Sequence, residues 1–204
     1  FTQSRAEMIP FVPEGAKKII DIGCGKGELG EQVKAARQAE VWGLEIDPAS
    51  AKVAETRLDK VLTGDIVALL PTLPDNYFDA IIFCDVLEHV VDPFSLLHEI
   101  KKKLSPGGVI VCSIPNVRYL LTLKTLLVDK DWHYTHEGVL DKTHLRFFTQ
   151  KSIREMFEAL DFEVKTLVGI NPIVSYKFTI LNALSLGYLS DTRFIQFACV
   201  AKPK

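Results

Sequence analysis

The chain has 204 residues, 48% of them hydrophobic and 25% charged, an ordinary composition for a soluble globular domain that needs no disulfide or metal to hold its core. Its formal net charge of −2 gives no long-range attraction to nucleic acid, so we expect no DNA partner. No window reaches about 18 uninterrupted apolar residues, which argues against a transmembrane helix. No charged-then-apolar leader opens the chain, so we expect a cytoplasmic protein.

The four cysteines form no CxxC pair, and three of them stand inside apolar runs. They are Cys24, Cys84, Cys112 and Cys199. We interpret them as small buried hydrophobic residues in a reducing compartment.

Short apolar runs alternate with helix-forming segments in the first half of the chain. Continuous runs typical of buried parallel strands occupy residues 18–22, 41–46, 60–63, 78–86 and 109–114. Between them we expect helices at 28–40, 48–57 and 93–104, the last with Asp92 as its N-cap. This alternation predicts a parallel sheet with helices on both faces, and ligands of such sheets bind at the carboxyl ends of the strands.

The pattern loosens after Pro115. A leucine-rich helix is expected at 119–128, ahead of a polar loop that carries histidines. Thr149 can cap a helix at 150–160, and strands are expected at 162–170 and 193–201. The apolar segment before the last strand is ambiguous, because 174–180 alternates like a strand and its remainder looks helical.

A glycine-rich loop, Asp21-Ile-Gly-Cys-Gly-Lys-Gly27, follows the first strand. Glycines let a strand turn sharply into a helix while the backbone lies against a ligand. A tight turn without a ligand is the simpler alternative. The segment from Gly25 to Gly30 also satisfies the GxGxxG pattern of dinucleotide-binding proteins, and Glu45 at the end of the second strand can accept from both ribose hydroxyls. Nicotinamide dinucleotides and S-adenosyl-L-methionine both carry such a ribose, so Glu45 does not separate them.

Three other features favour S-adenosyl-L-methionine. Asp21 precedes the first glycine, where a carboxylate can hold the amino group of a methionine but would repel a pyrophosphate. Asp65 closes the third strand, where it can accept from an adenine amino group. A chain of 204 residues also leaves no room for the second, substrate-binding domain that dehydrogenases commonly carry.

Five blocks in order, from about residue 19 to residue 114, resemble the class I S-adenosylmethionine-dependent methyltransferases: IIDIGCGKG, VWGLEIDP, TGDI, FDAIIFCDVLEHVVDP and LSPGGVIVCSIPN. The resemblance implies an α/β, Rossmann-like three-layer sandwich. Its seven-stranded, mostly parallel sheet would have the order 3-2-1-4-5-7-6, with strand 7 antiparallel.

The resemblance also implies where the cofactor binds. The expected cofactor-binding residues lie in the glycine loop and at the ends of the first four strands: Asp21, Gly23, Cys24, Gly25, Glu45, Ile46, Asp65, Ile66, Asp85 and Val86. Glu45 would bind the ribose, Asp65 and Ile66 would flank the adenine, and Asp85 and Val86 would lie near the sulfonium. Arg5 would reach the cofactor's carboxylate from the N-terminal segment.

Two further motifs supply candidate catalytic residues. The sequence Asp85-Val-Leu-Glu88-His89 follows the fourth strand, where the methyl group should lie. The block from Asp141 to Thr149 resembles one seen in small-molecule and sugar-linked methyltransferases, including ubiquinone-pathway O-methyltransferases, and we expect its His144 and Arg146 to face the site. A histidine suits removal of a proton from a hydroxyl acceptor, so His89 and His144 are the catalytic candidates. The alternative gives Glu88 and His89 purely structural roles.

Three other histidines have simpler interpretations. His98 precedes three lysines and is expected to be solvated. The loop with Trp132, His133, Tyr134 and His136 is interpreted as a lid or acceptor wall, or as a plain surface loop.

Asp85, Glu88, His89 and His144 also match, in type, a metal-binding set of small-RNA 3′-terminal 2′-O-methyltransferases. The first position here is Asp, one methylene shorter than the Glu of that set. Because of this difference, we expect no metal.

We therefore expect one domain over residues 1–204, with insertions at 116–148 and 171–191 that shape the acceptor site. Their apolar content suits an apolar acceptor, a dimer contact, peripheral contact with a membrane, or ordinary packing at the sheet edge. The expected activity is O-methylation of a small metabolite, saccharide or lipid-linked intermediate by a monomer or homodimer.

The alternatives are a metal-assisted RNA ribose 2′-O-methyltransferase, an NAD(P)-binding Rossmann protein and a non-catalytic binding module. The intact Gly23, Gly25, Glu45 and Asp65 argue against the last of these.

Overall fold

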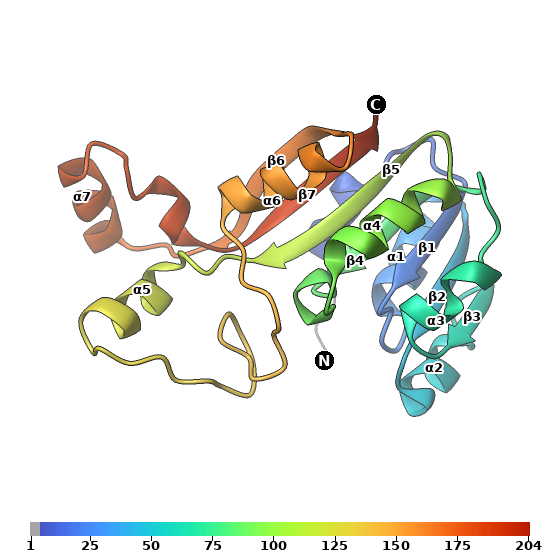
Figure 1. Cartoon of the computed structure of the whole chain (residues 1–204), viewed down its shortest axis with the longest axis horizontal. Coiled ribbons are helices and arrows are strands. Elements are labelled where there is room, and N and C mark those ends of the chain that lie inside the picture. The colour runs from blue at the N-terminus through green and yellow to red at the C-terminus, as the bar shows by residue number, and fades with distance from the viewer. Residues whose placement is uncertain (1–4) are drawn as a thin grey trace.

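The computed structural model describes residues 5–204. A seven-stranded sheet runs through it in the order β3-β2-β1-β4-β5-β7-β6 (Figure 1). Neighbouring strands from β3 to β5 are parallel, and β7 is antiparallel to both β5 and β6. The predicted sheet order and the antiparallel seventh strand are confirmed. The strands are β1 Lys18–Ile22, β2 Glu40–Glu45, β3 Lys60–Thr63, β4 Phe78–Cys84, β5 Leu104–Pro115, β6 Phe162–Pro172 and β7 Phe194–Pro203.

Helices cover both faces of the sheet because the buried strands alternate their apolar side chains between two cores. In β1, Ile20 and Ile22 belong to one core and Ile19 to the other. The first core lies under α4 and α6, which cross the face toward the viewer in Figure 1. The second lies under α1 and an N-terminal 3-10 helix, Ala6–Phe11. The helices are α1 Glu28–Arg37, α2 Pro48–Ala54, α3 Ile66–Leu69, α4 Pro93–Ile100, α5 Leu120–Leu127, α6 Gln150–Ala159 and α7 Tyr176–Leu184.

Several elements end earlier than the sequence predicts. The fourth strand stops at Cys84, because Asp85 has a φ of +56° and a 3-10 helix, Leu87–His89, follows it. The first helix stops at Arg37, where Gln38 takes a left-handed conformation with a φ of +49°. Residues 174–180 alternate apolar and polar side chains as a strand would, but the structure forms a helix there, since α7 begins at Tyr176.

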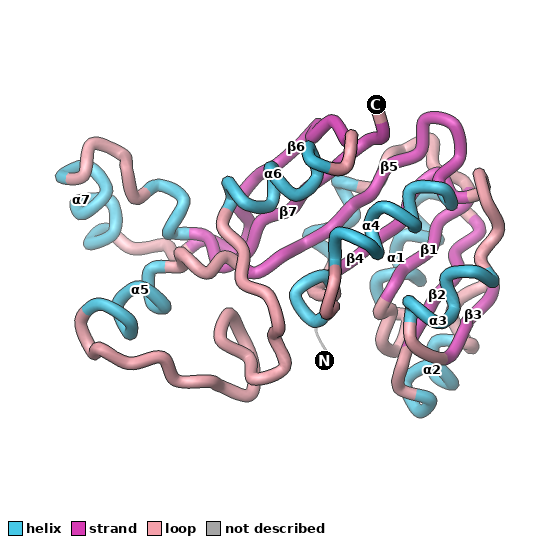
Figure 2. Tube along the Cα trace, in the orientation of Figure 1, coloured by secondary structure: helices cyan, strands magenta, loops and turns pink. Residues whose placement is uncertain are grey.

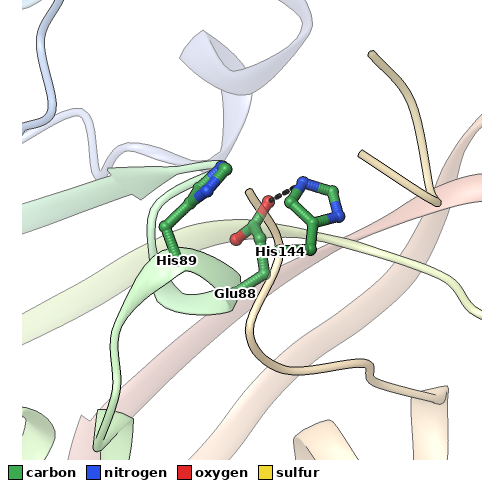
Figure 3. A group of neighbouring side chains, drawn as sticks. All are labelled: Glu88, His89 and His144. Carbon is green, nitrogen blue, oxygen red and sulfur yellow. Dashed lines mark ion pairs between the residues drawn. The ribbon is translucent and has the colours of Figure 1, made fainter. Parts of the chain in front are cut away.

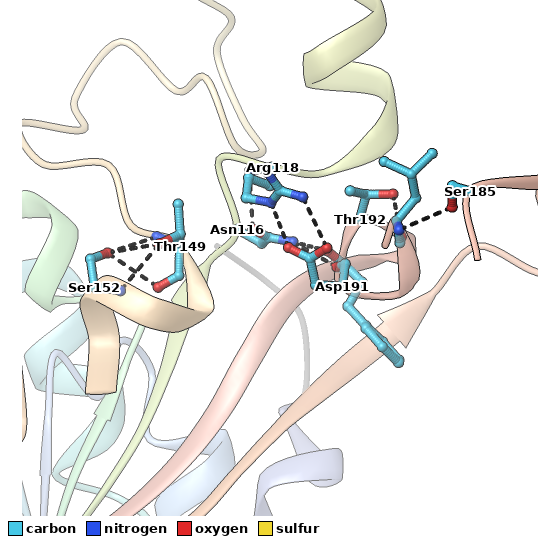
Figure 4. A network of polar contacts seen from close by, with 9 residues as sticks. Asn116, Arg118, Thr149, Ser152, Ser185, Asp191 and Thr192 are labelled. Atoms are coloured by element: carbon cyan, nitrogen blue, oxygen red, sulfur yellow. Dashed lines mark hydrogen bonds and ion pairs between the residues drawn. The ribbon is translucent and has the colours of Figure 1, made fainter. Parts of the chain in front are cut away.

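The segments carrying α5 and α7 extend beyond the carboxyl ends of β4 and β5 (Figure 1), and a long loop joins α5 to α6 (Figure 2). Two hydrogen-bonded side chains join the bases of these segments. Asn116 Nδ2 donates to the main-chain oxygens of Asp191 and Phe194, each at 3.0 Å. Arg118 donates to both carboxylate oxygens of Asp191, at 2.6 and 3.2 Å (Figure 4). This bidentate pair holds the two segments side by side.

Cys24, Cys112 and Cys199 are buried and Cys84 is half-buried, and all four are free thiols. Within residues 5–204, no helix combines the length and hydropathy that a membrane span requires. The predicted N-cap at Asp92 is confirmed, since its carboxylate accepts from the main-chain nitrogens of Phe94 and Ser95.

Thr149 caps α6 as predicted, within a reciprocal capping box. Its hydroxyl accepts from the Ser152 nitrogen at 3.1 Å, and the Ser152 hydroxyl accepts from the Thr149 nitrogen at 2.9 Å. We expect Thr149→Ala to lower the free energy of unfolding by about 1 kcal/mol, measured by urea denaturation. Thr149→Ser keeps the hydroxyl and should lose much less. Equal losses in both variants would show that the methyl group, and not the cap, is what matters.

Candidate active site

The glycine loop after β1 leaves main chain next to open space. Gly23 and Gly25 have φ values of +71° and +55°, which strongly favour glycine. The nitrogens of Gly23 and Cys24 both donate to the Leu44 oxygen, at 2.8 and 3.1 Å, so the loop is fixed to the end of β2. A Cβ on Gly23 would lie 2.6 Å from the Val86 side chain, whereas a Cβ on Gly25 would meet nothing within 4 Å. The backbone at Gly25 can therefore approach a ligand closely.

Glu45 holds this loop from the end of β2. Its Oε2 accepts from the Gly25 nitrogen and its Oε1 from the Asp47 nitrogen, each at 2.8 Å. A carboxylate offers about four lone-pair sites, so each oxygen retains the capacity to accept from a ribose hydroxyl. The carboxylate predicted to bind the ribose thus also positions the loop.

Asp21 lies at the base of the loop with 2% of its surface exposed. Burial, assisted by the negative charge of Glu45, raises the pKa of Asp21 to about 7. A buried carboxyl group of this kind is stabilised in its charged form by an ammonium group placed against it.

The ends of the first three strands open onto a cavity of about 570 Å³, which extends to the segment leading into α4. This volume is in the range of small-molecule sites. Five of the predicted cofactor-binding residues line it: Gly23, Ile46, Asp65, Ile66 and Val86. Asp65 also caps α3, where its Oδ1 accepts from the nitrogens of Val67 and Ala68.

The side chain of Cys24 points elsewhere. Its sulfur lies 2.6 Å from the position that a Cβ on Gly43 would take, so it packs into the sheet and only its main chain belongs to the loop. Ser95, Leu96 and Glu99 form the α4 side of the cavity, and no motif in the sequence points to them.

Asp85 lies at the centre of a polar network beyond the end of β4. Its Oδ2 is 2.8 Å from Arg5 Nη2, and its Oδ1 accepts from Gln196 Nε2 at 2.7 Å and from Ser113 Oγ at 3.2 Å. Burial raises the pKa of Asp85, and the Arg5 charge opposes this rise. Arg5, expected on the cofactor's carboxylate, therefore pairs with a protein carboxylate here. Ser113 and Gln196 were missed in the sequence analysis, although each is a polar residue in an apolar strand.

A second cavity, of about 60 Å³, is lined by both catalytic candidates. Besides His89 and His144, it is lined by Asp85, Glu88 and Asp141. His89 lines both cavities. Its ring centroid is 4.7 Å from that of His144, so the sequence motifs around residues 85–89 and 141–149 do meet in space.

Glu88, His89 and His144 point toward one another (Figure 3). Glu88 Oε1 is 3.9 Å from His144 Nε2. Burial, followed by the charge of Asp85, raises the pKa of Glu88 well above its ordinary value. Of the four residues considered as a metal set, Asp85 is instead held by its own partners.

Three remaining predictions concern surface groups. Arg146, expected to face the site, is exposed and donates to the Val91 oxygen. His98 is exposed as predicted, with 65% of its side chain accessible. In the loop after α5, Trp132 packs edge-on against Phe147, with ring centroids 5.3 Å apart. The three other polar aromatic residues of that loop, His133, Tyr134 and His136, are exposed.

The fold, the glycine-lined cavity and the match to a methyltransferase family model together define a Rossmann-like, S-adenosylmethionine-dependent methyltransferase. Residues 3–167 match the methyltransferase domain family, and the chain belongs to this family. It is therefore an enzyme with S-adenosylmethionine as its cofactor, which replaces the NAD(P)-binding and non-catalytic alternatives.

The individual proteins that resemble this chain share less than a third of its residues. A ubiquinone biosynthesis O-methyltransferase from Chromobacterium violaceum is 29% identical over 193 residues, which span 87% of this chain and 78% of the relative. The structure of a SAM-dependent methyltransferase from Archaeoglobus fulgidus is 24% identical with a TM-score of 0.68, covering 97% of this chain and 91% of the other. A possible histamine N-methyltransferase from Thermotoga maritima is 19% identical with a TM-score of 0.68, covering 98% and 88%. At these identities the two structures share the fold with this chain.

The raised pKa of Asp21 predicts how the free energy of unfolding depends on pH. The folded protein holds this proton up to about pH 7, whereas an unfolded chain releases it near pH 4, so the stability contributed by neutral Asp21 is lost as pH rises through about 7. Asp21→Asn should therefore raise the unfolding temperature of the ligand-free protein at pH 8, by an amount worth on the order of a few kcal/mol, and change it little near pH 4. The exposed Asp131→Asn is the control. A variant that is less stable than wild type at pH 8 would contradict the buried-charge argument.

The predicted role of Glu45 in binding the ribose can be tested by measuring cofactor affinity. Glu45→Ala removes two charge-assisted hydrogen-bond acceptors and should weaken S-adenosylmethionine binding by roughly 10- to 100-fold. Isothermal titration calorimetry measures the change, with the exposed Glu55→Ala as control. Unchanged affinity in Glu45→Ala would refute the ribose assignment.

Proposed function

We propose that this enzyme transfers a methyl group from S-adenosylmethionine to an oxygen atom of a small acceptor with an apolar part. The observation that carries this proposal is the position of His89 in the walls of both cavities. A donor in the larger cavity and an acceptor in the smaller one would meet beside this ring. Alignment of this kind contributes most of the catalysis when the donor is already activated.

Residues of the glycine loop and of the neighbouring strand ends fit the cofactor. The carboxylate of Asp21 suits its ammonium group, Gly25 offers an unobstructed backbone, and Glu45 can accept from its ribose hydroxyls. Ile46 and Ile66 supply apolar surface for the base. When bound there, S-adenosylmethionine supplies a methyl group on a positively charged sulfur.

The smaller cavity suits an acceptor that must lose a proton. The Val139 oxygen can only accept, so His144 Nδ1, 3.0 Å away, carries its hydrogen and leaves a lone pair on Nε2. The main-chain oxygen of Thr143 lies 3.1 Å from His89 Nδ1 and fixes His89 in the same tautomer. Two imidazole lone pairs and the Glu88 carboxylate therefore face the acceptor position. The O-methyltransferase activity named for the Chromobacterium relative supports oxygen as the methylated atom.

The segments at 116–148 and 171–191 support an acceptor with an apolar part. Both extend from the strand ends that border the smaller cavity, which Pro115 and Ile195 line. Their helices leave large apolar side chains exposed, among them Leu127 at 70% and Leu184 at 79%. We propose that this surface receives a lipid-like part of the acceptor or lies against a membrane that holds it.

The proposal is tested with radiolabelled S-adenosylmethionine and phenols that carry alkyl chains of increasing length. We expect O-methylated products, identified by mass spectrometry, and a kcat/KM that rises with chain length. His89→Ala should lower kcat/KM at least about 100-fold. His98→Ala, an exposed histidine on α4, should leave it unchanged.

Matched anilines provide the opposing outcome. Methylation of the anilines alone would overturn the assignment to oxygen, and equal rates for short and long chains would overturn the apolar acceptor.

A further inference from the structure

Glu88 is a buried carboxyl group without a hydrogen-bond partner. It is 1% exposed, and within residues 5–204 neither of its carboxylate oxygens has a hydrogen-bond partner. A buried polar group without a hydrogen bond costs free energy whether it is protonated or charged, so buried carboxyl groups are normally hydrogen-bonded, ion-paired or bound to a cation. His144 Nε2 is 3.9 Å from Glu88 Oε1, which is beyond hydrogen-bond distance. The residue belongs to the 3-10 helix Leu87–His89, next to the fully buried Leu87.

Two imidazoles face this carboxylate in the form that binds metal ions. The Nδ1 atoms of His89 and His144 lie 3.1 and 3.0 Å from main-chain oxygens, which hold each ring and leave the Nε2 lone pair unprotonated. A ring nitrogen that donates to a carbonyl while the other binds the ion is the usual arrangement of metal-bound histidines.

The three ligand atoms, one from each of Glu88, His89 and His144, lie within 4.8 Å of one another. In a tetrahedral zinc site with bonds of about 2.0–2.1 Å, ligand atoms are about 3.4 Å apart. The 3.9 Å between Glu88 Oε1 and His144 Nε2 is close to this spacing, and rotation of the side chains closes the remaining difference (Figure 3).

The main chain brings these residues together without the help of an ion. The main-chain oxygen of Glu88 accepts hydrogen bonds from the main-chain nitrogens of Leu145 and Arg146, at 2.8 and 3.0 Å. Asp141 braces the same loop by accepting from the nitrogen and hydroxyl of Thr143, at 2.8 and 2.7 Å. The ligand positions are therefore set in advance, which reduces the cost of forming a site.

We propose that Glu88, His89 and His144 bind a divalent transition-metal cation, with zinc the best match to two imidazoles and one carboxylate. Magnesium and calcium prefer oxygen ligands throughout, so they suit this set poorly. Three protein ligands leave a position open toward the 60 Å³ cavity, as in catalytic rather than structural zinc sites.

The role of the ion rests on the proposed function, although its binding does not. With the ion bound, the imidazole lone pairs of His89 and His144 bind it and would not take the acceptor's proton. The cation would favour the ionised acceptor oxygen instead, and the released proton would pass to solvent. The oxygen's electron pair then forms the bond to the methyl carbon while the carbon–sulfur bond breaks and its pair stays on sulfur. The products are the methylated acceptor and S-adenosylhomocysteine.

The test uses the full chain after treatment with EDTA and dialysis into metal-free buffer. Titration with zinc chloride, followed by calorimetry, should reveal one site per chain with a dissociation constant of micromolar or below. Cobalt(II) should give the visible absorption bands of a tetrahedral site, and magnesium should not compete. Absence of binding by zinc, cobalt and manganese would overturn the proposal on the wild-type protein alone.

Variants locate the site. Glu88→Gln, which keeps the side-chain shape, and His144→Ala should each weaken zinc binding by roughly 10- to 100-fold. His98→Ala is the matched control, because His98 Nε2 also lies 3.9 Å from a glutamate oxygen but is exposed. An equal loss in His98→Ala, or none in Glu88→Gln and His144→Ala, would show that zinc binds elsewhere and overturn the assignment.

The two proposals fail separately. Zinc bound at these residues without any O-methylated product would leave the site standing and overturn the function. O-methylation that is undiminished in EDTA, together with no zinc binding in the titration, would overturn the site and leave the function standing.

Discussion

The hydrogen bond from the Gly25 nitrogen to Glu45 is the contact on which the proposed cofactor site depends. It joins a loop whose backbone strongly favours glycine to the end of the neighbouring strand, 20 residues further along the chain. The same carboxylate helps to raise the pKa of Asp21, so the loop's position and the charge of the site are coupled. The stability contributed by neutral Asp21 is lost as pH rises through about 7, and in the proposed function the ammonium group of the cofactor offsets that loss.

Much of the fold could be read from local patterns, because buried parallel strands are continuous apolar runs and their helices begin at clear caps. Asp92 and Thr149 cap their helices where the sequence places them. The order of the strands came from resemblance to a family, since no local signal specifies it. The errors have local causes. The left-handed conformation of Asp85 ends a strand whose apolar pattern continues to Val86, and α7 lies in an exposed segment where burial does not impose a period on the sequence.

The candidate site was predictable where it follows the chain and obscure where it depends on tertiary contacts. The glycine loop and the carboxylates after the strands are motifs with a fixed place in such a sheet. The meeting of His144 with Glu88 depends on main-chain bonds between segments more than 50 residues apart, which spacing alone cannot reveal. The same is true of Arg5, whose pairing with Asp85 spans 80 positions of sequence. A shorter carboxylate at position 85 argued against a four-residue cluster, and the structure gives that residue other partners.

The bidentate pair between Arg118 and Asp191 has a consequence for how this enzyme diverges. It lies at the base of both outlying segments and joins two stretches of chain that are otherwise separated by α6, β6 and the long loop. Because the Arg118–Asp191 pair joins the two stretches, an insertion or deletion in either one changes the position of the other. We therefore expect α5 and α7 to change together during evolution, while the proposed methyl-donor cavity stays constant.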